Sequence, residues 1–339
     1  MTRCFRSRIL AVLATLLGLG VSAPAVAQNL AVAGSPIGTI QDRNYSRLFS
    51  ELRANGIHGY FPTFQYVEVP SPKSLGFESD FSMPCSPNGK GFAALRATGM
   101  KLIIPGELVY PSPGRIGRNT PANDPLNRII ACAGRENIAA ITNYDEAAFH
   151  GIPLRDVSKF YNQVKAIDPT LPVLMVHGPI ITDKREFRSN RLINDYLAKV
   201  QAYSAYSDIT GFDLYPIPAF LSKIATPLSG GANVEADRVV QEYMSWINQA
   251  VPGKKKLLVM QGFAYTNLYE KKFREDNFPR ELLDAIKPPS RNEMTMMMNQ
   301  ARSAGVDLVI WWGPASLPSK DSAPWPSILE MGRIHGRRF

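Results

Sequence analysis

The sequence predicts a single (β/α)8 barrel, also called a TIM barrel, over residues 28–339. Eight short apolar runs alternate in order with amphipathic stretches, and this alternation predicts a parallel sheet. Eight such units in roughly 310 residues are enough to close a barrel. The links after the apolar runs are long and the links before them are short, so we expect long βα loops at the C-terminal face.

The apolar runs are short and apolar almost throughout, which is typical of strands that are buried on both faces. The predicted strands are 30–34, 56–61, 101–104, 138–142, 172–176, 209–213, 256–261 and 306–311. Between them, apolar residues recur at spacings of three and four, which predicts helices. The clearest predicted helices are 45–54, 156–167, 191–203, 236–250 and 291–304.

The lengths and residue types of the links support the predicted barrel and indicate which of its ends carries the long loops. Helix-to-strand links are short and contain turn residues, such as Asn55-Gly56 and Pro252-Gly253. Strand-to-helix links are often long and rich in Pro, Gly and Ser, as in 70–91, 110–125, 215–237 and 262–290. Barrel enzymes build their sites from the loops at this end. The simpler alternative is that these loops have no function.

The first 27 residues have the pattern of a secretory signal peptide. Arg3, Arg6 and Arg8 form a positive region, residues 9–21 are apolar, and Ala25-Val26-Ala27 matches a cleavage site. No later segment is long and apolar enough to span a membrane. We therefore expect an exported protein, periplasmic or secreted, without stable membrane insertion.

Two cysteines remain after cleavage, Cys85 and Cys132. In an oxidising compartment they are expected to form a disulfide, although two separate buried thiols are the alternative. The formal charge of +9 falls to +6, because the first 27 residues hold three arginines and no acid. Basic residues are scattered, and only Lys254-Lys255-Lys256 is a tight run. We therefore expect no nucleic-acid partner.

Polar and aromatic residues gather where the predicted strands end, although the strands themselves are apolar. Because all parallel strands of a barrel end at the same face, these side chains are expected to meet at its mouth. The candidate residues for binding a substrate are Tyr60, Phe64, Gln65, Asn143, Tyr144, His177, Tyr215, Gln261, Trp311 and Trp312. Adjacent strand residues point to opposite faces, so one of the two tryptophans can face the mouth and the other the helices.

Four carboxyl groups belong to the same set: Glu107, Asp145, Glu146 and Asp213. Aromatic rings pack against sugar C–H faces, amides and carboxylates bind hydroxyl groups, and cleavage of a glycosidic bond usually needs two carboxyl groups. Each acid also has a structural alternative. Glu107 could form a loop salt bridge, Asp145 or Glu146 could cap a helix, and Asp213 could orient a neighbour.

Other chemistries fit the sequence less well. It contains no G-x-S-x-G motif of serine hydrolases and no G-x-x-x-x-G-K-[ST] phosphate-binding loop. The histidines lack the H-x-H and H-E-x-x-H spacings of metal sites, and a site made of His150, His177 and Asp145 is the remaining metal alternative. We expect no metal and no cofactor.

Four stretches resemble the glycoside hydrolase superfamily of (β/α)8 barrels. Residues 137–147 are similar to its fourth-strand segment with an acidic pair, although Ala147 stands where Pro is frequent. Residues 211–216, 259–263 and 306–313 resemble the sixth, seventh and eighth strands. The resemblance implies that Glu146 is the general acid/base. Many retaining relatives carry a nucleophilic Glu after strand seven, where this chain has Gln261.

The resemblance therefore implies an exported, monomeric glycoside hydrolase that acts on a poly- or oligosaccharide. Because an amide cannot act as the nucleophile, three possibilities stay open. Asp213 or Glu107 could be the second carboxylate, in an inverting mechanism. Asp145 could be the acid, with Glu146 in support. The barrel could also bind glycans without cleaving them.

Overall fold

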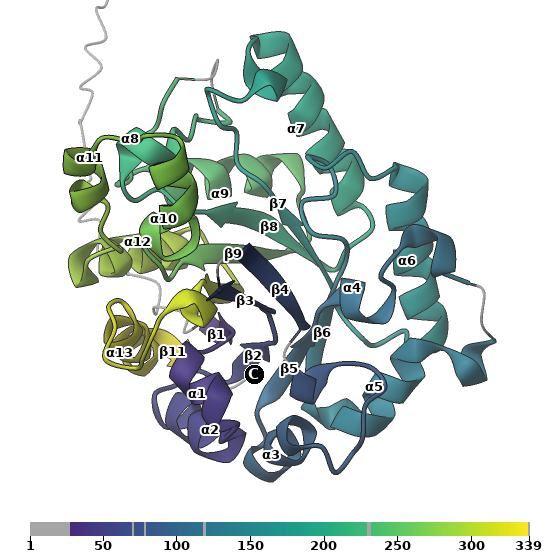
Figure 1. Cartoon of the computed structure of the whole chain (residues 1–339). Coiled ribbons are helices and arrows are strands. Elements are labelled where there is room, and N and C mark those ends of the chain that lie inside the picture. The colour runs from purple at the N-terminus through teal and green to yellow at the C-terminus, as the bar shows by residue number, and fades with distance from the viewer. Residues whose placement is uncertain (1–27, 70, 78, 118–119, 229–231, 338–339) are drawn as a thin grey trace, which may run out of the picture.

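The computed structural model describes residues 28–69, 71–77, 79–117, 120–228 and 232–337. Eight parallel strands form a closed barrel, because β1 pairs with both β2 and β10. The barrel strands are β1 Gln28–Ala33, β2 Gly59–Phe61, β5 Lys101–Ile104, β6 Ile138–Thr142, β7 Val173–His177, β8 Ile209–Leu214, β9 Lys255–Gln261 and β10 Leu308–Trp312. The predicted (β/α)8 barrel is thus confirmed (Figure 1).

Helices surround the barrel on its outer side (Figure 1). They are α2 Tyr45–Ala54, α3 Lys90–Thr98, α5 Pro125–Ala133, α6 Leu154–Ile167, α7 Asn190–Ser204, α9 Val239–Ala250, α12 Arg291–Ser303 and α13 Trp325–His335. Side chains at helix starts accept hydrogen bonds from exposed backbone N–H groups, as Asn44 does for α2 and Ser189 for α7. The five helices expected from periodicity are present with small shifts of their ends.

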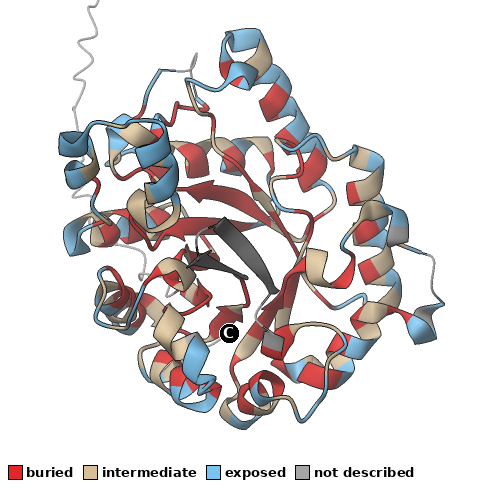
Figure 2. Cartoon of the chain, viewed as in Figure 1, coloured by how far each residue is buried: buried red, intermediate tan, exposed pale blue. Residues whose placement is uncertain are grey.

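Alternate residues along each strand build two separate apolar layers. Small and branched side chains such as Ala31, Ala140 and Leu174 fill the barrel interior. Their neighbours, such as Leu30, Ile141 and Val173, pack between the barrel and the helices. Both faces of the sheet are therefore buried (Figure 2), which explains why the strands read as continuous apolar runs.

The long βα loops contain most of the remaining elements. They are α1 Ile37–Asp42, the antiparallel hairpin β3 Phe64–Val69 and β4 Ser71–Phe77, α4 Gly106–Val109, α8 Ala219–Ser222, α10 Tyr265–Glu275 and α11 Arg280–Ala285. Short 3₁₀ turns occur at Ser79–Phe81, Pro113–Arg115, Pro121–Asn123, Arg135–Asn137, Arg185–Phe187 and Pro314–Ser316. A two-residue strand, β11 Gly336–Arg337, pairs with the start of β1.

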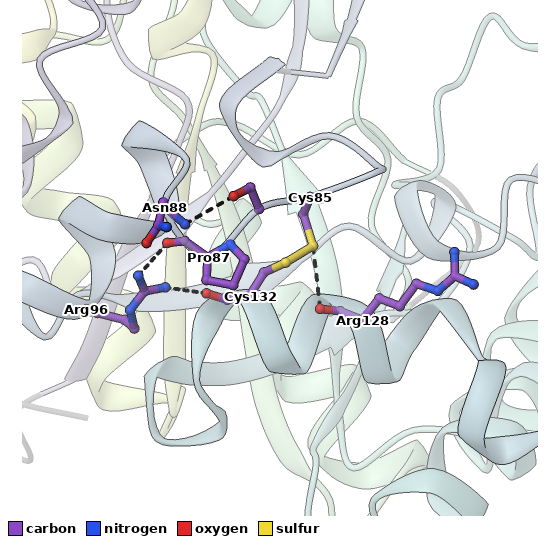
Figure 3. The surroundings of a disulfide bond; sticks show 7 residues. Cys85, Pro87, Asn88, Arg96, Arg128 and Cys132 are labelled. Atoms are coloured by element: carbon purple, nitrogen blue, oxygen red, sulfur yellow. Dashed lines mark hydrogen bonds between the residues drawn. A yellow bond between two sulfur atoms is a disulfide. The ribbon is translucent and has the colours of Figure 1, made fainter.

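The expected disulfide is present between Cys85 and Cys132, with sulfur atoms 2.09 Å apart (Figure 3). Cys85 lies in the loop before α3, and Cys132 lies in α5. Arg96 of α3 donates to the backbone carbonyls of Cys132 and Pro87, so it ties the same loop to α5. Together these contacts fix the two helices that flank β5.

The predicted signal peptide, residues 1–27, lies outside the described residues. Within the described ranges, every helix is too short or too polar to cross a bilayer.

Candidate functional site

A cavity of about 330 Å³ opens at the C-terminal end of the barrel. This volume is at the small end of the range for ligand sites, roughly 300–1,000 Å³. Its floor consists of inward-facing strand residues: Ala33, Val176, Val259 and Ile310. The lower part of the barrel interior is filled by side chains, so a ligand can occupy only the mouth.

All four predicted carboxyl groups line this cavity. Glu107 lies in α4, directly after β5, and Asp145 and Glu146 follow β6. Asp213 lies in β8 and points inward, like Ile209 four residues before it. The next helix, α6, begins only at Leu154, so neither Asp145 nor Glu146 caps it. The structure brings the four acids together, and their catalytic roles stay predictions.

Asp213 and Glu146 form a close carboxyl pair. A hydrogen bond joins them, and burial together with the charges of Glu146 and Asp145 raises the pKa of Asp213 well above its ordinary value. Two neighbouring carboxyl groups that are shielded from water cannot both be ionised at low cost. This environment therefore favours the protonated form of Asp213. Asp213 Oδ1 has no other partner among the described residues.

The backbone and neighbours of Glu146 hold its carboxyl group in place. Its φ angle is +41°, a conformation that is rare for residues other than glycine and is often found at functional sites. Its Oε2 lies 3.3 Å from His150 Nε2 on the outer side. Gly178, which follows β7, leaves room for Oε1, since a Cβ there would stand only 2.6 Å from that oxygen.

Asp145 is exposed to the cavity, yet protein atoms and two acids surround its carboxyl group. This partial desolvation, with the charges of Glu146 and Glu107, raises its pKa to about 7. Its backbone N–H donates a long hydrogen bond, 3.4 Å, to Glu107 Oε1. A carboxyl group with a pKa near neutral can exchange protons at neutral pH, as a catalytic acid or base must.

Aromatic rings form another part of the cavity wall. The rings of Tyr215 and Trp312 stack with centroids 5.5 Å apart and an angle of 29° between their planes. Phe263 packs edge-on against both rings, and Tyr265 Oη donates to the carbonyl of Tyr215 at 2.8 Å. The predicted stacking residues Tyr215 and Trp312 thus form a supported apolar surface beside the carboxyl groups.

The cavity is also lined by residues outside the list of candidate binding residues, among them Phe61, Thr63, Leu268, Tyr269 and Ser316. Phe61 stands beside Tyr60 at the end of the predicted second strand, and one member of any adjacent pair must face inward. Thr63 Oγ1 is buried without a hydrogen-bond partner in the described structure, so it can bind a ligand hydroxyl. Tyr269 comes from α10, which lies inside a link that was expected to be a loop.

Three predicted binding residues face the helices instead of the cavity. Tyr60 is fully buried against Phe49, and Trp311 is fully buried in the layer between barrel and helices. His177 is also fully buried; its Nε2 lies 3.0 Å from Ser204 Oγ in α7, and burial lowers its pKa to about 3. These corrections follow from strand alternation, because adjacent strand residues face opposite sides. His177 faces the helices and not the cavity, so it cannot form a metal site with His150 and Asp145. No cluster suited to a metal ion occurs in the described ranges.

Three more predicted binding residues have structural partners. Tyr144 packs edge-on against Phe160 of α6. Asn143 borders the cavity, but its side chain donates to Val157 O and accepts from the N–H of Tyr144. Gln261 is fully buried and bonds the N–H and the carbonyl of Ile217. The amide groups of Asn143 and Gln261 are therefore corrected to supporting positions, whereas Tyr144 Oη is buried without a hydrogen-bond partner among the described residues.

The last two predicted residues, Phe64 and Gln65, lie in β3. Their backbone belongs to the hairpin after β2, and their side chains are outside what the structure describes.

Comparisons with known proteins show the fold. No family model matches the chain, and no curated protein matches its sequence. A proposed alpha-L-fucosidase from Bacteroides thetaiotaomicron VPI-5482 superposes with a TM-score of 0.54 at 12% identity, covering 98% of this chain and 99% of that one. The Ignisphaera aggregans GH53 catalytic domain gives 0.51 at 10% identity, covering 93% and 100%. The Bacillus cereus spore cortex-lytic enzyme SleL gives 0.51 at 9% identity, covering 93% and 76%. The chain thus shares the barrel architecture of glycoside hydrolases.

Proposed function

We propose that the protein is an exported glycoside hydrolase that cleaves uncharged oligo- or polysaccharides. One observation carries the proposal: the neighbouring carboxyl groups of Glu146 and Asp213 lie in a barrel-mouth cavity that also contains the stacked rings of Tyr215 and Trp312. The pair supplies a proton, and the rings supply a surface for a sugar face. Four acids in one cavity repel anionic sugars, which favours uncharged substrates.

Glu146 acts as the general acid in this proposal, and it protonates the leaving oxygen. Asp213 is not proposed as the opposing carboxylate, because it stands beside Glu146, whereas glycosidases use separations of roughly 5–5.5 Å or 6.5–9.5 Å. Asp213 instead holds the acid proton on Glu146 until the leaving oxygen accepts it. The proton that the general base removes from the attacking water restores the acid after the product has left.

Asp145 is proposed as the general base that activates water. It is exposed to the cavity, and its pKa of about 7 suits proton removal near neutral pH. Glu107 positions Asp145 through its backbone N–H. Direct attack by water inverts the anomeric centre, so NMR of the first product should show inverted configuration. A retained configuration would reject this assignment of roles.

The test of function is reducing-sugar release from a panel of neutral bacterial and plant polysaccharides, with residues 28–339 as the enzyme. Release should fall by at least about 10²-fold in Glu146→Gln, because general acid catalysis typically contributes that much. Glu242→Gln is the matched control, since Glu242 pairs with Arg238 on α9 and does not line the cavity. Release that survives in Glu146→Gln would move the acid to another carboxyl group. Binding without any release would favour a non-catalytic glycan-binding barrel, the alternative that the buried Gln261 supports.

A further inference from the structure

Helix α10 carries a row of aromatic side chains at every fourth position. Tyr265, Tyr269 and Phe273 occupy one face, because residues four apart in a helix lie above one another. Their rings are in contact, with centroids 6.2 Å apart for the first pair and 6.3 Å for the second. None of the residues of α10 is buried, so the row is not part of the core.

The middle residue of the row reaches the cavity. Tyr269 lines the cavity, although 44% of its surface is exposed. Tyr265 contacts Phe263, which packs against Trp312 in the cavity wall. From Tyr265 to Phe273 the helix rises about 12 Å, which is longer than one sugar ring. In Figure 1, α10 stands beside the barrel mouth, and Figure 2 shows it largely exposed.

The charged side chains of α10 pair among themselves. Ion pairs four residues apart join Lys271 to Glu275, Lys272 to Asp276 and Arg274 to Glu270. The charges are therefore balanced within the helix, and nothing in it favours a strongly charged partner such as a nucleic acid. An exposed aromatic row that continues a sugar-sized cavity suits a second uncharged sugar ring.

We infer that the aromatic row of α10 is an outer subsite that binds the sugar units next to the one in the cavity. The substrate class is therefore a chain of uncharged sugars and not a single glycoside. This inference rests on the proposed function for the identity of the ligand. It does not require that the chain be cleaved, so binding can test it separately.

The experiment measures Kd by calorimetry for oligosaccharides of one to six units, made of β-1,4-linked glucose, mannose, galactose or N-acetylglucosamine. Glu146→Gln is the background, so that no probe is hydrolysed. We expect affinity to rise by about tenfold between one and three units, as a stacking contact of about 1.4 kcal/mol would give. Phe273→Ala and Tyr269→Ala should remove this rise. Lys272→Ala, on the charged part of the same helix, should keep it.

The possible outcomes separate this inference from the proposed function. A length-dependent affinity that disappears in Phe273→Ala supports the subsite even if the unaltered protein cleaves nothing. Hydrolysis with equal affinity for all lengths overturns the subsite and leaves the glycosidase proposal intact. A lower Tm in Phe273→Ala with an unchanged length dependence shows that the row only stabilises α10, and it also overturns the inference. No binding of any probe overturns it together with the proposed substrate class.

Discussion

Gly178→Ala should inactivate the protein without unfolding it. The added Cβ would stand 2.6 Å from Glu146 Oε1, whereas ordinary contacts begin at 3.4 Å, so the carboxyl group must move by about 0.8 Å. A displacement of about 1 Å at a catalytic group can cost about 10²-fold in rate. The atom that moves is the end of a flexible side chain, and Gly178 does not have a positive φ. The fold should therefore accept the change.

The assay is kcat on a cleaved glycan together with Tm. We expect kcat to fall by about 10²-fold and Tm to change little, since the atom that must give way is the end of a flexible side chain. Gly38→Ala is the control, because its Cβ would meet only Pro318 O at an ordinary 3.6 Å. A kcat within twofold of the unaltered protein would refute the role of Glu146. A matching fall of Tm would show misfolding instead.

Three further predictions concern the disulfide and two acids. Replacing Cys85 and Cys132 by Ser should cost about 4 kcal/mol, because the bond closes a loop of 47 residues. For a chain of this size we expect a Tm about 6 °C lower by calorimetry, and a fall below about 2 °C would contradict this. If Asp145 is the base, it must be ionised, so kcat/KM should rise with pH through about 7; a flat profile would argue against this role. The pKa of Asp213 is raised in the folded state. Asp213 therefore lowers the free energy of unfolding increasingly as the pH rises above the pKa of this residue in the unfolded chain, about 4. The Tm of Asp213→Asn minus the Tm of the unaltered protein should therefore increase from pH 5 to pH 8, while activity is lost. A Tm difference that decreases over this range would disprove a raised pKa.

Strand positions were predictable from the sequence, but strand faces were not. All eight strands lie within a few residues of the apolar runs, because strands buried on both faces are apolar throughout. The same property removes the alternation that would show which residues point inward. For this reason Tyr60 and His177 were chosen as binding residues, whereas the inward members of those pairs are Phe61 and Val176.

The four acids of the site were predictable, because their residue type and their position after apolar strands are sufficient to identify them. Glu107, Asp145, Glu146 and Asp213 lie at or just after the ends of β5, β6 and β8, and the barrel brings them together as expected. The pairing of Asp213 with Glu146 depends on side-chain direction, which the sequence does not encode locally. Helices α8, α10 and α11 lie inside links that were predicted to be loops. Helix α5 begins where another such link ends, although Asp124-Pro125 is a recognisable start signal for it.

The buried amide of Gln261 limits how this barrel can evolve. Its Nε2 donates to the carbonyls of Ile217 and Phe263, and its Oε1 accepts from the N–H of Ile217. A single change to Glu would introduce a nucleophile at the end of β9, but it would also set a carboxylate against two carbonyl oxygens in a dry environment. Each carbonyl left unpaired costs about 1–3 kcal/mol, so Gln261→Glu should lower Tm markedly. A switch to retaining chemistry at this position would therefore require the loop after β8 to be rebuilt first.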